Sequence, residues 1–301
     1  MRALVRAAHP ELGGADMSVI VIEGTYRLVG SRPDGDSIRF YPNKPAEWDL
    51  VPGPVRRNAK GGAQLRFDGI DTLETHYPTK AGEVHQPPKF GQAALQELLT
   101  WVGFTDVRRD ERDTVTSTVP EHAPGYIFTR GADVHGRCVA FAGRGRAPGP
   151  SGEPMHVDVA AVQQTANHHL LLQGMAYPTF YRKLFPDLRT EMIDATERAK
   201  SRRSGLWPFD LTFSGIKVEG LSQLTESAVI MPKLFRRLAD YLVLNDGDPS
   251  LAGFRDYVEE RGDRLFIIST GHSTGFDFVI NVADQTVKLT TPLEDLVFEE
   301  R

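Results

Sequence analysis

Three absences narrow the classes of protein that this sequence encodes. The chain of 301 residues has one cysteine, Cys138, so an internal disulfide is impossible and nothing in the sequence requires an oxidising compartment. No stretch approaches the roughly 18 consecutive apolar residues that a transmembrane helix needs. An excess of positive charge is also missing, because the formal net charge is -5. Any site for a polyanion must therefore be a local basic pocket.

The first residues lack the features of an export signal. Residues 1–16 contain Arg2 and Arg6 but no continuous apolar core of signal-peptide length. We therefore expect a cytoplasmic protein without membrane association, in which residues 1–17 form an N-terminal tail. Met17 is an alternative start, because strand-like residues follow it directly.

The composition, 40% hydrophobic and 25% charged, is typical of a globular protein. Segments rich in β-branched and aromatic residues predict strands at 19–22, 25–29, 37–41, 64–70 and 138–142. Between these strands, apolar residues at a spacing of three to four predict a helix over 89–103. Loops rich in proline and glycine are expected at 42–62 and 143–154.

The rest of the chain adds helices and then a second mixed region. Apolar spacing predicts helices around 162–174 and 188–205, and another that begins at Pro232. Further strands are expected at 265–269, 276–282 and 286–291, with a turn at 245–249 and a loop around His272. The sequence therefore predicts an α+β protein, with one domain at 18–208 and a C-terminal α+β extension of unknown role at 209–301.

The most informative segment for chemistry is 65–78, LRFDGIDTLETHYP. Its strand ends at Asp71 and Glu74 follows three residues later, so the two carboxylates would repel each other without a cation between them. Hard divalent cations such as Ca²⁺ and Mg²⁺ prefer oxygen ligands. Arg66 lies five residues before Asp71, and an ideal strand would place these side chains on opposite faces. A bulge or strong curvature is needed to bring them together.

Two further segments combine polar residues with the start of a strand. They are PDGDS at 33–37 and DVHGR at 133–137. Taken alone, DGD is typical of a hairpin turn, and Arg137 is typical of a surface charge. His168 and His169 are adjacent on a predicted helix, where neighbouring side chains point about 100° apart, which argues against a shared metal.

The order of these motifs resembles that of the thermonuclease (staphylococcal nuclease-like) family. DGD-[ST]-strand, R-x-x-x-x-D-T-x-E-T and D-x-x-G-R-strand follow one another in the family's order. FGQAALQELL, NHHLLLQGMAYP and ATERAKSRRSGLWP match three further family segments, the last two carrying N-x-x-L-x-x-x-G-x-A and A-x-x-x-A-x-x-x-x-x-G-L-W. The similarity covers residues 24–208 and does not reach the C-terminal third. It implies an OB-fold, a five-stranded β-barrel with three helices.

The resemblance also implies a metal site and a general base. Asp36 and Asp71 match the carboxylates that bind one Ca²⁺ ion, and Thr72 matches the residue whose backbone carbonyl binds it. Glu74 matches the proposed general base. The family usually has a proline before this glutamate, whereas this chain has Leu73. Proline restricts the residue before it, so we expect its loss to loosen the loop at Thr72.

The phosphate-contacting arginines of the family match Arg66 and Arg137. Their planar guanidinium groups present paired donors that suit phosphate oxygens. Three weaker candidates for substrate contact are Lys80, His135 and Tyr181, with Phe180 as an alternative to the tyrosine.

Residues of suitable chemistry occupy all six principal positions, which favours a Ca²⁺-dependent nuclease acting on DNA and possibly on RNA. In that hypothesis Glu74 takes a proton from water, and the ion and the arginines stabilise the developing charge. The main alternative is an inactive nuclease-like module that binds single-stranded nucleic acid through a basic groove and aromatic side chains. A third possibility is a scaffold whose C-terminal region binds a protein partner, although nothing in that region identifies one.

Overall fold

The main sheet of the N-terminal half closes on itself. The computed structural model describes residues 18–300, so the expected tail at 1–17 lies outside the described residues. The strand order is β11–β1–β2–β3–β10–β9, and β1 also pairs with β9, so five of these strands form a ring. Their bounds are β1 Ser18–Tyr26, β2 Arg39–Pro42, β3 Ala63–Phe67, β9 Ala123–Ala132, β10 Cys138–Arg144 and β11 Pro154–His156.

The predicted strands at 19–22 and 138–142 are confirmed as parts of β1 and β10, whereas β9 was missed. The sequence of β9, APGYIFTRGA, begins beside a proline and contains two glycines, which weakens the local strand signal. Its pairing with both β1 and β10 overrides that signal. Residues 27–29 lie outside β1, so the predicted second strand at 25–29 was wrong over this part.

The helices of this half largely follow the apolar spacing. The helix predicted at 89–103 is confirmed as α1, Pro88–Val102, which buries Leu95, Leu98 and Leu99 against the sheet. The helix predicted around 162–174 is divided into α2, Val159–Val162, and α3, Ala166–Leu172. The division occurs because the Thr165 hydroxyl caps α3 by accepting from the backbone N–H of His168. The third predicted helix is α4, Pro186–Ser201.

Several short elements connect the larger ones. The loop predicted at 42–62 contains a 3₁₀ helix, Pro45–Leu50, which buries Trp48. The other short elements are β4 Ile70–Asp71, β5 Tyr77–Thr79, β6 Gly82–Val84, β7 Asp106–Arg109, β8 Val115–Val119, β12 Tyr177–Pro178, β13 Phe180–Tyr181 and a 3₁₀ helix at Trp207–Phe209.

The C-terminal extension combines three helices with six short strands. Its elements are β14 Ile216–Lys217, α5 Leu221–Glu226, α6 Pro232–Leu244, α7 Phe254–Arg261, β15 Arg264–Ile267, β16 His272–Gly275, β17 Ile280–Ala283, β18 Thr286–Leu289, β19 Leu296–Phe298, and 3₁₀ helices at Phe276–Val279 and Leu293–Asp295. The helix start at Pro232 is confirmed. The strand predicted at 276–282 is 3₁₀ helix over its first half, and the loop expected at His272 is strand β16.

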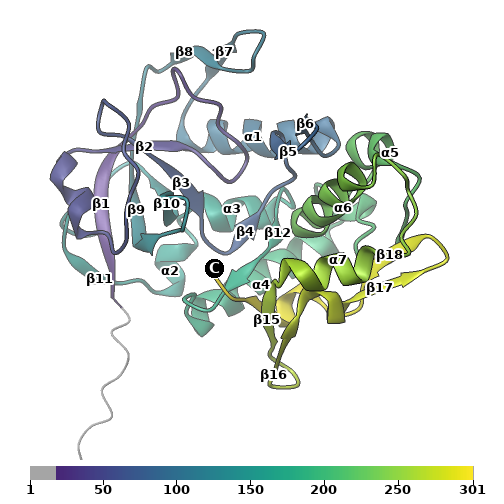
Figure 1. The fold of residues 1–301 in the computed structure, drawn as a ribbon. Helices are drawn as coiled ribbons and strands as arrows, with labels where there is room; N and C mark the ends of the chain where they lie inside the picture. The colour runs from purple at the N-terminus through teal and green to yellow at the C-terminus, as the bar shows by residue number, and fades with distance from the viewer. Residues whose placement is uncertain (1–17, 301) are drawn as a thin grey trace, which may run out of the picture.

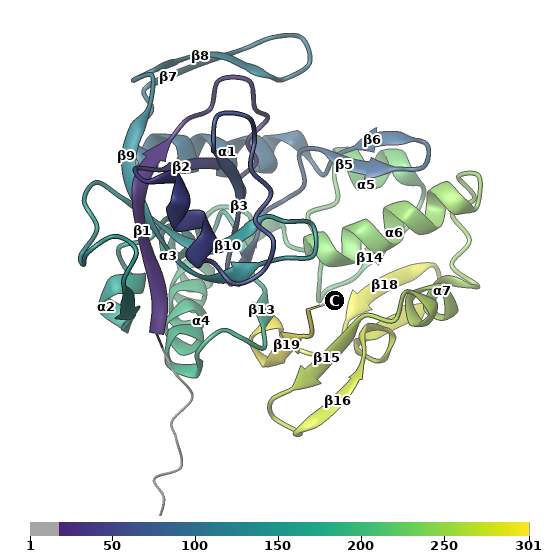
Figure 2. The ribbon, with the colours of Figure 1, turned by 60° about the vertical axis from the view of Figure 1, so that its left-hand side comes forward.

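A second hydrophobic core joins the extension to the rest of the chain. It contains Leu73 and Tyr177 together with α6 residues such as Leu234 and Leu238. Strand β13 pairs with β19 in parallel, which adds backbone hydrogen bonds to this contact. Figures 1 and 2 both place α6 beside the β5–β6 hairpin. The extension therefore packs directly on the strands and loops that follow β3.

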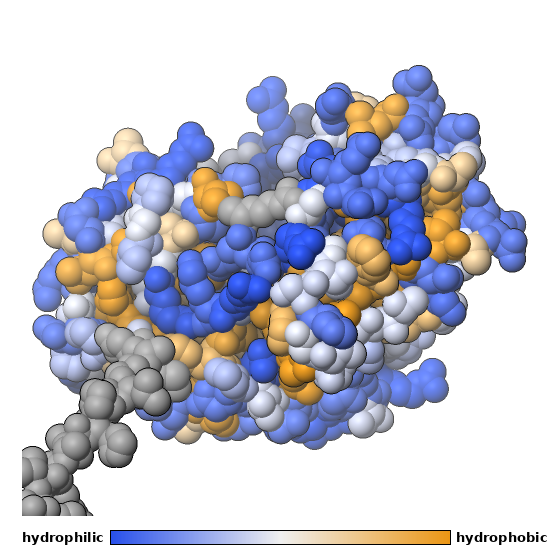
Figure 3. Space-filling view, turned by 60° about the horizontal axis from the view of Figure 1, so that its bottom comes forward, coloured by the Kyte–Doolittle hydropathy of each residue, from blue (hydrophilic) through white to orange (hydrophobic). Residues whose placement is uncertain are grey.

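Hydrophilic residues cover most of the face drawn in Figure 3, with hydrophobic residues between them. Over residues 18–300, no helix has both the length and the apolar character to cross a membrane.

Candidate active site

A sharp turn between β3 and β4 brings Arg66 and Asp71 into one site. The chain turns at Asp68 and Gly69, and Gly69 has φ +76°, which favours glycine. A Cβ atom there would also lie 2.6 Å from Met192 Cε. Arg66 and Asp71 thus belong to two strands, and the alternation rule for a single strand does not apply. A bulge or strong curvature was expected to bring the two residues together, and the structure instead has a turn between two strands.

Asn167 supports this turn from helix α3. Its side chain is fully buried, accepts a hydrogen bond from Ala142 N–H at 3.0 Å and donates to the carbonyl of Asp68 at 2.9 Å. A second donation reaches the carbonyl of Ala140 at 3.0 Å. One amide therefore links α3, β10 and the turn before β4, which explains the place of asparagine at the start of the NHHLLLQG segment.

The DGD segment lies against Thr72. Asp34 and Ser37 form an isolated β-bridge, as a tight turn requires. Gly35 is essential for the approach, because a Cβ atom there would lie 2.7 Å from Thr72 Oγ1. The Thr72 N–H donates to Asp36 Oδ2 at 3.2 Å. The hairpin interpretation is therefore correct, and the same turn delivers Asp36 to the start of the loop that carries Glu74.

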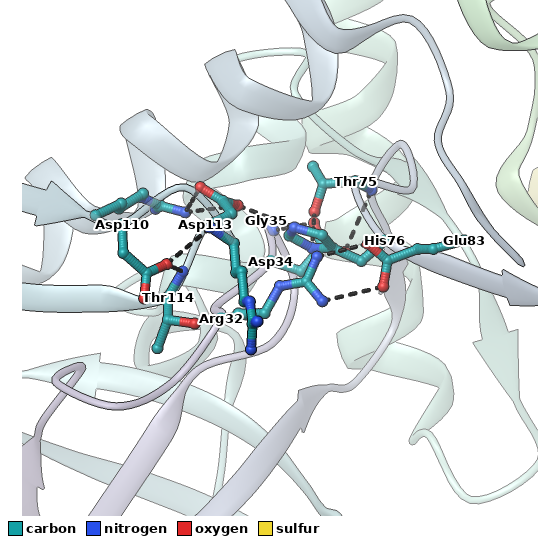
Figure 4. Close-up of polar contacts among 11 residues, drawn as sticks. Arg32, Asp34, Gly35, Thr75, His76, Glu83, Asp110, Asp113 and Thr114 are labelled. Atoms are coloured by element: carbon teal, nitrogen blue, oxygen red, sulfur yellow. Dashed lines mark hydrogen bonds and ion pairs between the residues drawn. The ribbon is translucent and has the colours of Figure 1, made fainter.

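A polar network continues from this turn to the β7–β8 hairpin (Figure 4). The Thr75 N–H donates to Asp34 Oδ2 at 3.5 Å, and Thr75 Oγ1 lies 2.7 Å from His76 Nδ1. His76 Nε2 in turn lies 2.9 Å from Asp113 Oδ2. These contacts hold the loop that follows Glu74 without using the carboxylates of Asp71 and Glu74.

Burial raises the pKa values of the acidic groups on the DGD turn. The pKa of Asp36 lies well above its ordinary range because of burial, with the carboxylate of Asp71 as the next cause. Burial raises the pKa of Asp34 to about 7, and the carboxylate of Glu74 adds to the shift. The four carboxylates are close enough to oppose one another's ionisation. Such a cluster favours any cation that can reach it.

A guanidinium from the extension lies between Asp71 and Glu74. Arg236 Nη2 is 2.8 Å from Asp71 Oδ2 and Nη1 is 3.2 Å from Oδ1, which makes a bidentate pair. Nη1 also donates to Glu74 Oε1. Burial alone would lower the pKa of Arg236, but the two carboxylates outweigh it and raise the pKa well above its ordinary value.

Sequence reasoning missed Arg236 completely. It lies in the helical segment PKLFRRLADY, where nothing distinguishes it from the other basic residues, 35 in all. An indirect signal was the apolar Leu73 between Thr72 and Glu74, which we interpreted as a loosened loop and which in the structure packs against the extension.

Gln86 fixes the backbone of Glu74. Its side-chain Oε1 accepts from the Glu74 N–H at 3.2 Å, and its own N–H donates to the Glu74 carbonyl at 2.8 Å. The Gln86 amide nitrogen then donates to the carbonyl of Ile230 at 2.9 Å. Burial raises the pKa of Glu74, while the charge of Arg236 lowers it.

The two predicted phosphate-contacting arginines belong to two neighbouring parts of the main sheet, where β3 pairs with β10. Arg66 is on β3, and its guanidinium lies over the ring of Tyr181, 4.6 Å from the centroid. Arg137 immediately precedes β10, and its Nε donates to Asp133 Oδ2 at 2.7 Å while 38% of its side chain stays exposed. Its charge also opposes the rise in the pKa of Glu74 that burial causes. The chain thus brings Glu74 and both arginines to one region.

The weaker candidates have different surroundings. Tyr181 lies in this region but already packs against Arg66 and Phe298. Lys80 is exposed in the β5–β6 turn, and His135 is exposed in the turn before β10, where its backbone N–H donates to Asp133.

Leu73 is 1% exposed and belongs to the second hydrophobic core. We expected a looser loop because a leucine restricts the backbone of the preceding residue less than the family's proline does. In the structure the leucine side chain supplies another constraint, because it anchors the loop between Thr72 and Glu74 to the extension. This packing is the physical reason for a large apolar residue at the position.

The donor set suits Ca²⁺ in kind, since Asp36 and Asp71 offer carboxylate oxygens and Thr72 offers a carbonyl. Thr72 Oγ1 is also buried without a hydrogen-bond partner within residues 18–300. However, no group of three or more His, Cys, Asp and Glu side chains in the described part of the chain is arranged to hold a metal ion. Both oxygens of Asp71 face Arg236 instead.

Most of this grouping of acids and arginines lies in a part of the chain that matches a nuclease family. Residues 64–208 match the model of the family described as staphylococcal nuclease homologue, so the chain carries a domain of that family. The resemblance inferred from the motif order is thereby confirmed. The matched region includes Arg66, Asp71, Glu74 and Arg137, while Asp36 precedes it. None of the curated proteins compared matches the chain.

Proposed function

We propose that the protein is a nuclease that hydrolyses phosphodiester bonds of DNA and possibly of RNA. The observation that carries this proposal is that Arg66 and Glu74, from segment 65–78, and Arg137, from segment 133–137, lie close enough to one acidic cluster to affect its electrostatics. In this proposal the strand ring is the family's five-stranded OB barrel, with α1, α3 and α4 as its helices. The domain spans 18–208, and the extension 209–301 covers part of its site. The cytoplasmic location expected from the sequence stays a prediction.

Each residue has a role that its chemistry supports. Glu74 takes a proton from the attacking water, and Arg66 and Arg137 contact the phosphoryl oxygens. Asp36, Asp71 and the carbonyl of Thr72 would hold one Ca²⁺ ion. When bound, the ion would act as a Lewis acid on a phosphoryl oxygen. Lys80, His135 and Tyr181 are proposed as contacts to the flanking nucleotide.

One observation favours a second candidate function, a binding module without catalysis. Arg236 pairs with Asp71 and Glu74, the residues that catalysis needs free. In this alternative Arg66, Arg137 and Tyr181 bind single-stranded nucleic acid through phosphate contacts and base stacking.

The test is a digest of plasmid DNA and of RNA with Ca²⁺, with Mg²⁺ and with EDTA. We expect Glu74→Gln to reduce cleavage roughly 10²–10⁴-fold and Arg137→Lys at least about 10²-fold, because an ammonium cannot replace a planar fork. Glu83→Gln is the matched control, since Glu83 is exposed and pairs only with Arg32 among the contacts described. Cleavage by Glu74→Gln at the wild-type rate would refute its role. Binding without cleavage under all conditions would establish the second candidate.

A further inference from the structure

Arg236 lies between the carboxylate of Asp71, which the proposed Ca²⁺ ion requires, and that of Glu74, the proposed general base. Its guanidinium contacts both oxygens of Asp71 and one oxygen of Glu74. Asp71 is 6% exposed, so its carboxylate has few alternatives for neutralisation by solvent. A divalent ion on Asp71 would have to share its two oxygens with the guanidinium and lie beside a second positive charge, so the two cations compete for this carboxylate.

Helix α6 presents Arg236 from a fixed position. One turn before it, Lys233 pairs with Asp263 at 3.2 Å, and one turn after it Asp240 accepts from the Tyr77 hydroxyl at 2.8 Å. The Ile230 carbonyl, just before the helix, is held by Gln86, which also holds the backbone of Glu74. The helix and the acidic loop are therefore tied together on both sides of the arginine.

The apolar contacts have the same effect. Leu73, between Thr72 and Glu74, packs in the same core as Leu234 and Leu238 of α6. The family match ends at residue 208, so the arginine comes from outside the matched domain. A separate part of the chain therefore supplies the positive charge and the packing that keeps it in place.

We propose that Arg236 is an intramolecular counter-cation that competes with a divalent ion for Asp71 while it also pairs with Glu74. The proposal rests on the cation site of the proposed function. The competition makes the extension a determinant of metal affinity. The ion binds only in the fraction of molecules whose Arg236 side chain has left the carboxylates, and its apparent affinity falls by that fraction.

The experiment measures Ca²⁺ binding to the full chain by calorimetry for the wild type, Arg236→Gln, Arg236→Lys and Arg237→Gln. We expect Arg236→Gln to bind Ca²⁺ at least about tenfold more tightly. If the guanidinium occupies the carboxylates in about nine-tenths of the wild-type molecules, the apparent Ca²⁺ affinity of the wild type is reduced about tenfold. Arg236→Lys keeps one charge but loses the planar fork, so we expect a smaller gain. Arg237→Gln is the matched control, because Arg237 is the adjacent arginine of the same helix and pairs with Asp263. In this variant Asp263 still has Lys233 as a partner.

Thermal unfolding gives a readout that involves no catalysis. Without Ca²⁺, we expect Arg236→Gln to unfold at a lower temperature than the wild type, since the carboxylates lose their counter-ion, and Ca²⁺ should restore most of the loss. The stability of Arg237→Gln should not respond to Ca²⁺ in this way. If Arg236→Gln does not fold, the lysine variant carries the same comparison.

Ca²⁺ affinity that is unchanged or weaker in both Arg236 variants would overturn the proposal. The result is separable from the proposed function, because binding and unfolding are measured without hydrolysis. If the protein cleaves DNA but its Ca²⁺ affinity is the same in the wild type and the Arg236 variants, the nuclease function stands and the competition by Arg236 is refuted. If the protein never cleaves DNA or RNA but Arg236→Gln binds Ca²⁺ more tightly, the competition by Arg236 stands and the nuclease function is refuted.

Discussion

Replacing Leu73 by alanine tests whether the acidic loop and the extension form one cooperative unit. The side chain is 1% exposed and packs in the core that contains α6. Truncation of a leucine in such a site removes its buried methyl groups and leaves a cavity, which typically costs about 2–5 kcal/mol. A domain of ordinary stability has about 5–15 kcal/mol in total, so the loss is a large fraction.

The assay is urea denaturation of the full chain, followed by circular dichroism, with the free energy of unfolding taken from the midpoint and the slope. Leu50→Ala is the control, because Leu50 is 46% exposed and we expect its replacement to cost less than about 0.5 kcal/mol. We expect Leu73→Ala to lower stability by about 2–5 kcal/mol within a single transition. A loss no larger than that of Leu50→Ala would refute the packing argument.

Two further predictions concern helix α3. Asn167→Ala removes the partners of Ala142 N–H and the Asp68 carbonyl, so we expect a loss of about 2–5 kcal/mol in urea unfolding; a loss below about 1 kcal/mol would contradict it. Burial lowers the pKa of His168 even though Glu191 lies 2.9 Å away, so between the folded-state pKa and the unfolded value near 6.5 the unfolded chain binds more protons. Stability should therefore fall as the pH drops from about 6.5 through the folded-state pKa. His168→Gln should flatten this dependence in urea midpoints measured from about pH 5 to pH 7.5; an unchanged slope would exclude His168 as its source.

The sequence allowed much of the nuclease-like half to be predicted, because its information is local. The apolar spacing of α1 and the strand composition of β10 are each visible in a short stretch of sequence. The same is true of each motif that contains Arg66, Glu74 or Arg137. Strand β9 was missed because its stability comes from pairing with two neighbours and not from its own composition.

The candidate site was predicted less completely than the motifs suggest. Arg236 contacts Asp71 across a separation of 165 residues, and no local pattern encodes such a pairing. The departure at Leu73 was visible in the sequence, but its meaning depended on the core that covers it. The residues of the acidic cluster could thus be identified from the sequence, whereas their counter-ion could be identified only from the fold.

The separation between Asp71 and Arg236 also sets an order in time. A ribosome adds the acidic residues of the site first and their arginine 165 positions later. The parallel pairing of β13 with β19 can form only later, because Val297 and Phe298 are synthesised after α6. While the polypeptide grows, Asp71 and Glu74 have no Arg236 to pair with and meet the ions of the surrounding solution. The pairs of Asp71 and Glu74 with Arg236 can therefore form only after helix α6 has been synthesised.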